Sequence, residues 1–149
     1  MGDRKKNLQT AALLIGETIG PIVKSSQIYE TDAWGNRDQP SFYNQVHIIK
    51  SPLSAEELMT HILLIEAQMG RIRTIKNAAR IIDIDILFFN EEIINLPHVI
   101  VPHTQIPYRR FVLTPLDELA PGFIHPVYKQ TIHELLLKCK DPLQVVPLR

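Results

Sequence analysis

Two aspartates, Asp83 and Asp85, are the residues whose type and spacing most directly suggest chemistry. They lie in the apolar run Ile81–Phe89, which reads IIDIDILFF and predicts a strand. Side chains two apart on a strand share a face, so the carboxylates project together from Cα atoms about 7 Å apart. A divalent cation offsets their repulsion, and Mg²⁺ prefers one or two carboxylates with phosphates and water. The alternative is a strand with one solvated face, and spacing alone favours neither interpretation.

A cluster of cations comes immediately before this predicted strand. It comprises Arg71, Arg73, Lys76 and Arg80, and Arg109 and Arg110 follow further along the chain. Guanidinium groups match phosphate oxygens and stabilise charge that develops on them. A basic run by itself is more often a solvated loop. The combination of paired carboxylates with cations favours phosphoryl chemistry.

A second predicted strand, Phe42–Lys50, carries Phe42 and Asn44 on one face. An asparagine on an apolar face needs partners, and its amide offers donors and an acceptor to the edge of an amide-like heterocycle. The Phe42 ring can stack on such a ring. The alternative is that Asn44 caps a neighbouring loop while Phe42 belongs to the core. Without further information the residues favour this alternative.

The remaining patterns predict an α+β fold. Apolar spacings of three and four from Asp3 predict a helix that Gly20-Pro21 ends, and the capping boxes Ser54/Glu57 and Thr131/Glu134 each begin another. Further predictions are a strand over Ile22–Glu30, a loop over Thr31–Pro40, a short strand over Val99–Val101 and a helix from Pro107 through Val112. This order predicts a sandwich in which helices pack on one face of an antiparallel sheet.

Length and composition set further limits. The 149 residues correspond to one domain, 1–149, and sixteen Lys and Arg balance sixteen Asp and Glu. That balance of charge excludes a globally basic protein that coats nucleic acid. The single cysteine, Cys139, excludes an internal disulfide framework or a Cys-rich zinc site. No apolar stretch approaches the ~20 residues of a membrane span, and the N-terminus lacks the apolar core of a signal peptide. We expect a soluble cytoplasmic protein.

From Gly2 to about His125 the chain closely resembles the 6-hydroxymethyl-7,8-dihydropterin pyrophosphokinase family of folate biosynthesis. The matching strings are Asp38-Gln39-Pro40 with Phe42-x-Asn44, Ile65-Glu66-x-Gln68-x-Gly70-Arg71-x-Arg73, Arg80-x-x-Asp83-x-Asp85-Ile86, Val101-Pro102-His103 and Arg109-x-Phe111. The resemblance implies a ferredoxin-like α+β sandwich. It also implies transfer of the pyrophosphoryl group of MgATP to the 6-hydroxymethyl group of the dihydropterin, with release of AMP.

The resemblance also implies a role for individual residues. Asp83 and Asp85 would bind two Mg²⁺ ions and, with Arg71 and Arg80, form the catalytic set. The residues implied to bind ATP are Glu66, Arg73, Lys76, Ile86, His103 and Arg109. The residues implied to bind the pterin are Thr31, Trp34, Phe42, Asn44 and Phe111, with the ring between Phe42 and Phe111. The implied partners are therefore small molecules, with no nucleic acid and no membrane.

Members of that family begin with a central strand ending in Gly-Ser-Asn, whereas this chain enters the pattern at Gly2. We expect residues upstream of Met1 to supply the strand, and the 149 residues alone to form a marginally stable monomer unless a strand is exchanged. Two alternatives remain open at this point. One is a truncated, non-catalytic remnant that binds nucleotide or pterin. The other is a ferredoxin-like RNA-binding module, which the paired aspartates disfavour because they would repel the RNA backbone.

Overall fold

The computed structural model describes residues 3–31, 41–70 and 81–148. Its helices are α1 Arg4–Thr18, α2 Ala55–Gln68, the short 3₁₀ helix η1 Ile106–Tyr108, α3 Arg110–Leu119 and α4 Ile132–Lys138. Its strands are β1 Ile22–Ser25, β2 Tyr29–Thr31, β3 Phe42–Asn44, β4 His47–Ile49, β5 Ile94–Leu96, β6 Val99–Val101 and β7 Val145–Pro147.

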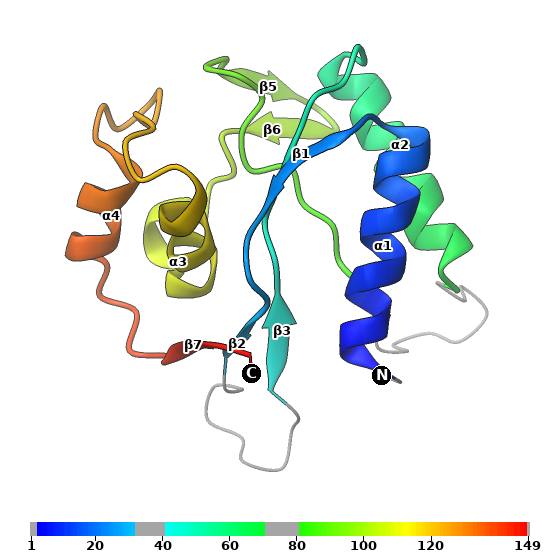
Figure 1. The fold of residues 1–149 in the computed structure, drawn as a ribbon. Coiled ribbons are helices and arrows are strands. Elements are labelled where there is room, and N and C mark those ends of the chain that lie inside the picture. The colour runs from blue at the N-terminus through cyan, green and yellow to red at the C-terminus, as the bar shows by residue number, and fades with distance from the viewer. Residues whose placement is uncertain (1–2, 32–40, 71–80, 149) are drawn as a thin grey trace.

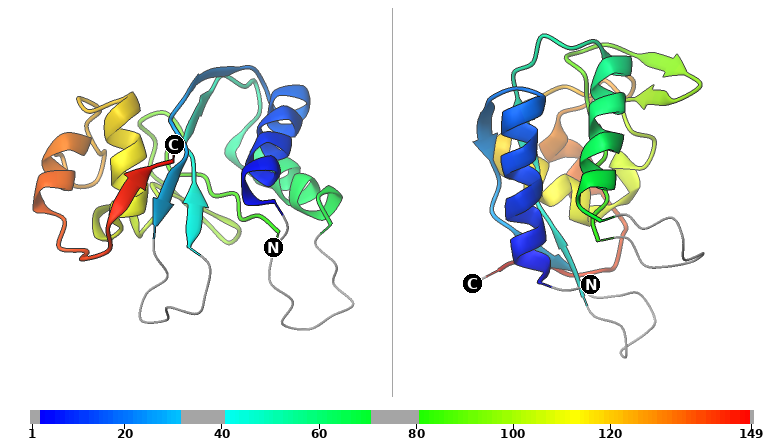
Figure 2. Two further views of the ribbon diagram at one scale, coloured as in Figure 1. Left: turned by 60° about the horizontal axis from the view of Figure 1, so that its bottom comes forward. Right: turned by 90° about the vertical axis from the view of Figure 1, so that its right-hand side faces the viewer.

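The helices form two packed pairs, α1 with α2 and α3 with α4, and the short strands β1, β2 and β3 run between the pairs (Figure 1). Figure 2 shows the same separation from two other directions. The first pair encloses a hydrophobic cluster that includes Ile15, Ile62, Ile65 and Ile86. The second pair encloses a cluster built on Leu113, Ile132 and their neighbours. The predicted α+β class is confirmed.

The predicted helix starts are confirmed by their caps. The Asp3 carboxylate accepts from the Lys6 N–H at 3.0 Å and begins α1. Both capping boxes form: the Ser54 and Thr131 hydroxyls accept the N–H three residues on, and the glutamate there accepts the N–H of the cap residue. Helix α2 ends at Gln68 with Met69 as its C-cap, and Gly70 follows with a φ of +94° that is disfavoured for any residue with a Cβ.

The strands form three small antiparallel sheets, with strand orders β1-β4, β3-β2-β7 and β5-β6. Each of the two long predicted strands is divided in two, because side chains take over backbone bonds at the division. The Ser26 hydroxyl accepts from the Val46 N–H at 2.9 Å, and the Gln45 side chain donates to the Ser26 carbonyl at 2.8 Å. The predictions of strands over Ile22–Glu30 and Phe42–Lys50 are therefore correct in place but not in continuity.

The prediction of a strand over Ile81–Phe89 is wrong. Residues 82–88 form no strand ladder with any described part of the chain. The Ile84 N–H donates to the Glu66 carboxylate at 2.9 Å, and the Leu87 carbonyl accepts from the His103 N–H at 2.9 Å. A side chain and a single long-range backbone bond therefore hold this segment in place of a neighbouring strand.

The C-terminal half departs further from the predictions. The helix expected from Pro107 through Val112 is instead η1 followed by α3, because Arg109 between them has an extended backbone (φ −123°, ψ 110°). The Val99–Val101 strand is confirmed as β6. Its hairpin partner β5 and the strand β7 had no signal strong enough to predict them.

Helix α3 is joined to β2 by a part-buried contact. The Tyr29 hydroxyl donates to the Glu118 carboxylate at 2.7 Å, and that carboxylate also accepts from the Gln27 N–H. Burial, followed by the hydrogen bond and the negative charge of Glu118, raises the pKa of Tyr29 from 10.0 to about 12. The neutral phenol is therefore favoured in the folded protein relative to the unfolded chain.

We expect this contact to be lost at high pH. Because the folded pKa of Tyr29 is raised, its contribution to stability is complete below pH 10 and disappears as the pH rises from 10 to about 12. Urea unfolding at pH 9, 10 and 11 should show a steeper fall in the free energy of unfolding for the wild type than for Tyr29→Phe. If the free energy of unfolding falls equally with pH in the two proteins, the Tyr29 phenol is not the cause of the fall.

Candidate active site

Four side chains lie on one face of the β2–β3 pair. Thr31 is opposite Phe42 and Tyr29 is opposite Asn44 in the antiparallel register. Directly opposite residues share a face, as do residues two apart on one strand, so all four project the same way. The structure thus brings together three of the residues predicted to bind the pterin, namely Thr31, Phe42 and Asn44.

This face carries polar atoms that the described part of the chain leaves without partners. Thr31 is 1% exposed, and neither its hydroxyl nor the buried side-chain nitrogen of Asn44 has a hydrogen-bond partner among the described residues. A buried polar group without a partner costs about 1–3 kcal/mol, so such groups are uncommon unless a ligand satisfies them. Phe42 is 57% exposed beside them and can stack on a planar ring.

The opposite face of the same strands is held by the start of α1. The Arg4 guanidinium donates to the carbonyl and the hydroxyl of Ser41, and it lies 4.0 Å from the centroid of the Tyr43 ring. The Ser41 hydroxyl in turn donates to Glu30, which pairs with Tyr43 across the strands. These polar groups are thus engaged within the protein. On the Thr31 face the Tyr29 hydroxyl bonds to Glu118, but the Thr31 hydroxyl and the Asn44 side-chain nitrogen have no partner among the described residues.

The first turn of α3 contributes Phe111 and, just before the helix, Arg109. Phe111 is half-buried and Arg109 is exposed. Arg109 lines a cavity of about 310 Å³ together with Tyr108 and the C-terminal residues Asp141, Pro142 and Leu143. One end of α3 therefore presents a cation and an aromatic ring within three residues of each other.

Asp83 and Asp85 are both exposed, and Ile84 between them is half-buried against the first hydrophobic cluster. The buried Glu66 of α2, which is 6% exposed, accepts the Ile84 N–H. Glu66 therefore holds the backbone between the two aspartates. Ile86, also predicted to lie on the nucleotide side, is buried in the first cluster.

The two aspartates fit a magnesium site that is completed by its substrate. They supply the hard oxygen ligands that Mg²⁺ prefers. The described residues contain no group of three or more His, Cys, Asp or Glu side chains that could hold a metal ion. An ion bound by Asp83 and Asp85 would therefore need ligands beyond such a group of described side chains, and phosphates and water are ligands that Mg²⁺ accepts.

His103 is connected to the aspartate segment through its backbone bond to Leu87. Its ring Nδ1 accepts from the Gln105 N–H at 3.2 Å, so Nε2 carries the proton of the neutral ring. The other predicted site residues, Trp34, Arg71, Arg73, Lys76 and Arg80, lie outside the described residues. The described residues stop after β2 and shortly after α2, and they resume just before β3 and at the start of the aspartate segment (Figure 1).

Sequence reasoning missed the residues that support this site. Glu66 was interpreted as a nucleotide ligand, and the contact between its carboxylate and the Ile84 backbone has no local signature. Asp141 bonds to the first turn of α3 from far along the chain. Of these supporting residues, Tyr29 could have been found from the sequence. It precedes Thr31 by two residues on a strand and must therefore share its face.

Comparison with known proteins identifies the family. A family model described as 7,8-dihydro-6-hydroxymethylpterin-pyrophosphokinase (HPPK) matches residues 1–121. The chain belongs to this family. Its ferredoxin-like α+β architecture agrees with the predicted fold, and membership favours neither the RNA-binding module nor the inactive remnant.

Individual relatives agree with this assignment. The chain is 42% identical over 120 residues to the 2-amino-4-hydroxy-6-hydroxymethyldihydropteridine pyrophosphokinase of Bacillus subtilis, covering 80% of this chain and 72% of that protein. It is 37% identical over 134 residues to the protein of the same name from Aquifex aeolicus, covering 90% of this chain and 83% of that one.

Longer relatives also match. The Folic acid synthesis protein fol1 of Pneumocystis carinii is 37% identical over 120 residues, which cover 80% of this chain. The matched region spans only 16–19% of the length of that protein and two others of the same name, so the HPPK chain corresponds to a small part of each. Within the described residues, no helix is both long and apolar enough to cross a membrane.

Proposed function

We propose that this HPPK-family chain is an ATP-dependent enzyme that transfers the pyrophosphoryl group of ATP to the hydroxymethyl group of 6-hydroxymethyl-7,8-dihydropterin, releasing AMP, in folate biosynthesis. The observation that carries the proposal is the family match over residues 1–121, which contains every residue predicted for the site. We further propose that the partners are small molecules only, with no nucleic acid, and that the chain acts as a single-domain cytoplasmic protein that is monomeric unless a strand is exchanged.

The proposed pterin site is the Thr31 face of β2 and β3 together with the first turn of α3. The hydroxyl of Thr31 and the side-chain nitrogen of Asn44 are buried without partners among the described residues, and a pterin offers ring nitrogens and an amide-like edge that can bond to both. The exposed Phe42 would cover one side of the ring and Phe111 the other. Trp34 is proposed to line the same pocket.

The proposed phosphate site lies beside the aspartate segment. Asp83 and Asp85 would hold two Mg²⁺ ions, while Arg73, Lys76, His103 and Arg109 would bind the phosphates of ATP. When bound, the Mg²⁺ ions would neutralise negative charge on the phosphate oxygens. Arg71 and Arg80 would stabilise the charge that develops as the bond to AMP breaks.

The roles of the protein groups follow from this placement. Stacking and edge hydrogen bonds orient the pterin so that its hydroxymethyl oxygen can attack the β-phosphorus of ATP. A new O–P bond forms, the bond between the β-phosphorus and the AMP oxygen breaks, and the hydroxyl proton is released to solvent. Orientation and charge stabilisation suffice for this step, so we assign no protein nucleophile.

The deciding experiment measures AMP release by the purified chain with ATP, magnesium and the reduced pterin alcohol. We expect AMP to appear only when the pterin is present, together with a pterin product heavier by one pyrophosphoryl group. Omitting the pterin controls for simple ATP hydrolysis. If AMP forms at the same rate without the pterin, or if no pyrophosphorylated pterin is found, the proposed function is wrong.

Phe111→Ala should weaken pterin binding by about tenfold and leave ATP binding within about twofold of the wild type. Aromatic stacking contributes about 0.5–1.5 kcal/mol beyond the buried area, and the ring of Phe111 is proposed to contact only the pterin. Isothermal titration with each ligand separately measures both effects.

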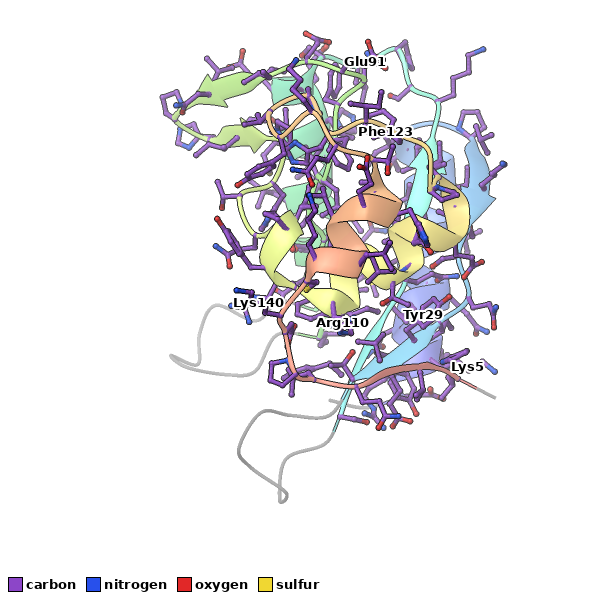
Figure 3. The ribbon with its side chains drawn as sticks, turned by 90° about the vertical axis from the view of Figure 1, so that its left-hand side faces the viewer. Lys5, Tyr29, Glu91, Arg110, Phe123 and Lys140 are labelled. Atoms are coloured by element: carbon purple, nitrogen blue, oxygen red, sulfur yellow. The ribbon has the colours of Figure 1, made fainter. Side chains whose placement is uncertain are left out.

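Phe123→Ala is the matched control for Phe111→Ala, because Phe123 is also a half-buried phenylalanine but packs against Phe88 with ring centroids 4.8 Å apart. Figure 3 shows Phe123 far from Arg110, the neighbour of Phe111. The control should leave pterin affinity unchanged in the folded protein. Equal losses for pterin and ATP in Phe111→Ala would instead place Phe111 in the general core.

A further inference from the structure

The C-terminal segment, residues 139–147, lies outside the family match, yet it contacts the helix that carries Arg109 and Phe111. Asp141 Oδ2 accepts from the backbone N–H of Arg110 at 3.0 Å. The Arg110 guanidinium donates back to the carbonyls of Asp141 at 3.1 Å and Cys139 at 2.9 Å. These three hydrogen bonds form the Asp141–Arg110 contact.

Helix α3 depends on this contact for its N-terminal cap. Its N-cap residue, Arg109, makes no side-chain capping bond, so a carboxylate from elsewhere satisfies the first free N–H. A negative charge at this end of the helix is also favoured by the helix dipole. The second oxygen of Asp141 accepts from the Leu143 N–H at 3.0 Å, which orients the carboxylate from the other side.

The same segment then joins the strand that carries Thr31. Strand β7 pairs with β2, with Val145 opposite Thr31 and Val146 opposite Glu30. The other edge of β2 pairs with β3, which carries Phe42 and Asn44. Figure 3 shows the segment continuing from Lys140 past the Arg110 end of α3 toward the strands. One short stretch of chain therefore connects both proposed walls of the pterin site.

We propose that Asp141 is a positioning residue for the pterin site, because it fixes the first turn of α3 and thereby sets the separation of Phe111 from Phe42. Asp141 also lines the cavity beside Arg109, so the contact orders the wall of that cavity. This inference rests on the proposed function, and it goes beyond it by giving a role in substrate binding to a segment outside the family match.

The test compares pterin affinity in four proteins by calorimetry: wild type, Asp141→Ala, Asp141→Asn and Asp117→Ala. Asp141→Ala should lose about tenfold in pterin affinity, since displacements of an ångström in a binding group carry penalties of this order or larger. Asp141→Asn keeps an acceptor oxygen and should recover part of the loss. Asp117 lies on the same helix but bonds to His133, so its replacement should change affinity less than twofold.

A double-mutant cycle separates positioning from general destabilisation. If Asp141 acts through Phe111, adding Asp141→Ala to Phe111→Ala should lower pterin affinity by less than about threefold further. An undiminished tenfold loss in that background would overturn the inference, as would wild-type affinity in a folded Asp141→Ala protein. If Asp141→Ala does not fold, the test uses Asp141→Asn. Wild-type pterin affinity together with an unchanged kcat in that variant would then overturn the inference. Wild-type protein that neither binds the pterin nor releases AMP would instead overturn the proposed function, and this inference with it.

Discussion

Replacing either Asp83 or Asp85 with alanine should reduce AMP release by at least about a hundredfold, a loss typical of removing one group that stabilises charge in a transition state. Both carboxylates are exposed, and Glu66 fixes the backbone between them. The described residues contain no group of three or more His, Cys, Asp or Glu side chains that could hold the ion without them. Each aspartate should therefore be indispensable for turnover in magnesium.

The fold should survive these substitutions. Exposed positions usually change the free energy of unfolding by less than about 0.5 kcal/mol, and removing one of two like charges relieves repulsion. Thermal unfolding of each variant checks this expectation. Glu91→Ala is the matched control, since Glu91 is an exposed acid in the turn that follows the same segment. Near-wild-type AMP release by either aspartate variant would contradict the metal assignment.

The parts of the fold that the sequence predicted are those with a local cause. The capping boxes at Ser54 and Thr131 and the apolar spacing of α1 and α2 each act within a few residues, and the structure contains all of them. The Ile81–Phe89 strand failed for the opposite reason. Its apolar content predicted a strand, but only Ile86 of the segment is buried, and pairing into a ladder depends on a neighbouring strand that local sequence does not reveal.

In the candidate site, too, the features with a local cause could be predicted and the long-range contacts could not. The shared face of Phe42 and Asn44 followed from the two-residue period of a strand, and the antiparallel register then added Thr31. The contacts made by Asp141 and Glu118 could not be predicted, because they join residues far apart in the sequence. Glu66 is a further case: the family resemblance implied that it binds ATP, and its buried contact with the Ile84 backbone could not be predicted from the sequence.

The buried carboxylate of Glu66 gives the second large expected effect. Glu66→Ala removes the acceptor for the Ile84 N–H and leaves that backbone group without its partner. A lost partner of this kind costs about 1–3 kcal/mol, so the free energy of unfolding should fall by that amount. Because Ile84 lies between Asp83 and Asp85, the displaced segment should also lower kcat by more than about tenfold.

Two comparisons determine whether Glu66 positions the aspartates or binds ATP directly. Glu66→Gln keeps an acceptor oxygen and should retain most of the stability and more of the kcat than Glu66→Ala. Glu56→Ala, an exposed acid in the first turn of the same helix, should leave both quantities near wild type. Urea unfolding and steady-state kinetics measure the two effects. If Glu66→Ala raised the KM for ATP with kcat and stability unchanged, Glu66 would be a nucleotide ligand, because only lost ground-state binding acts on KM alone.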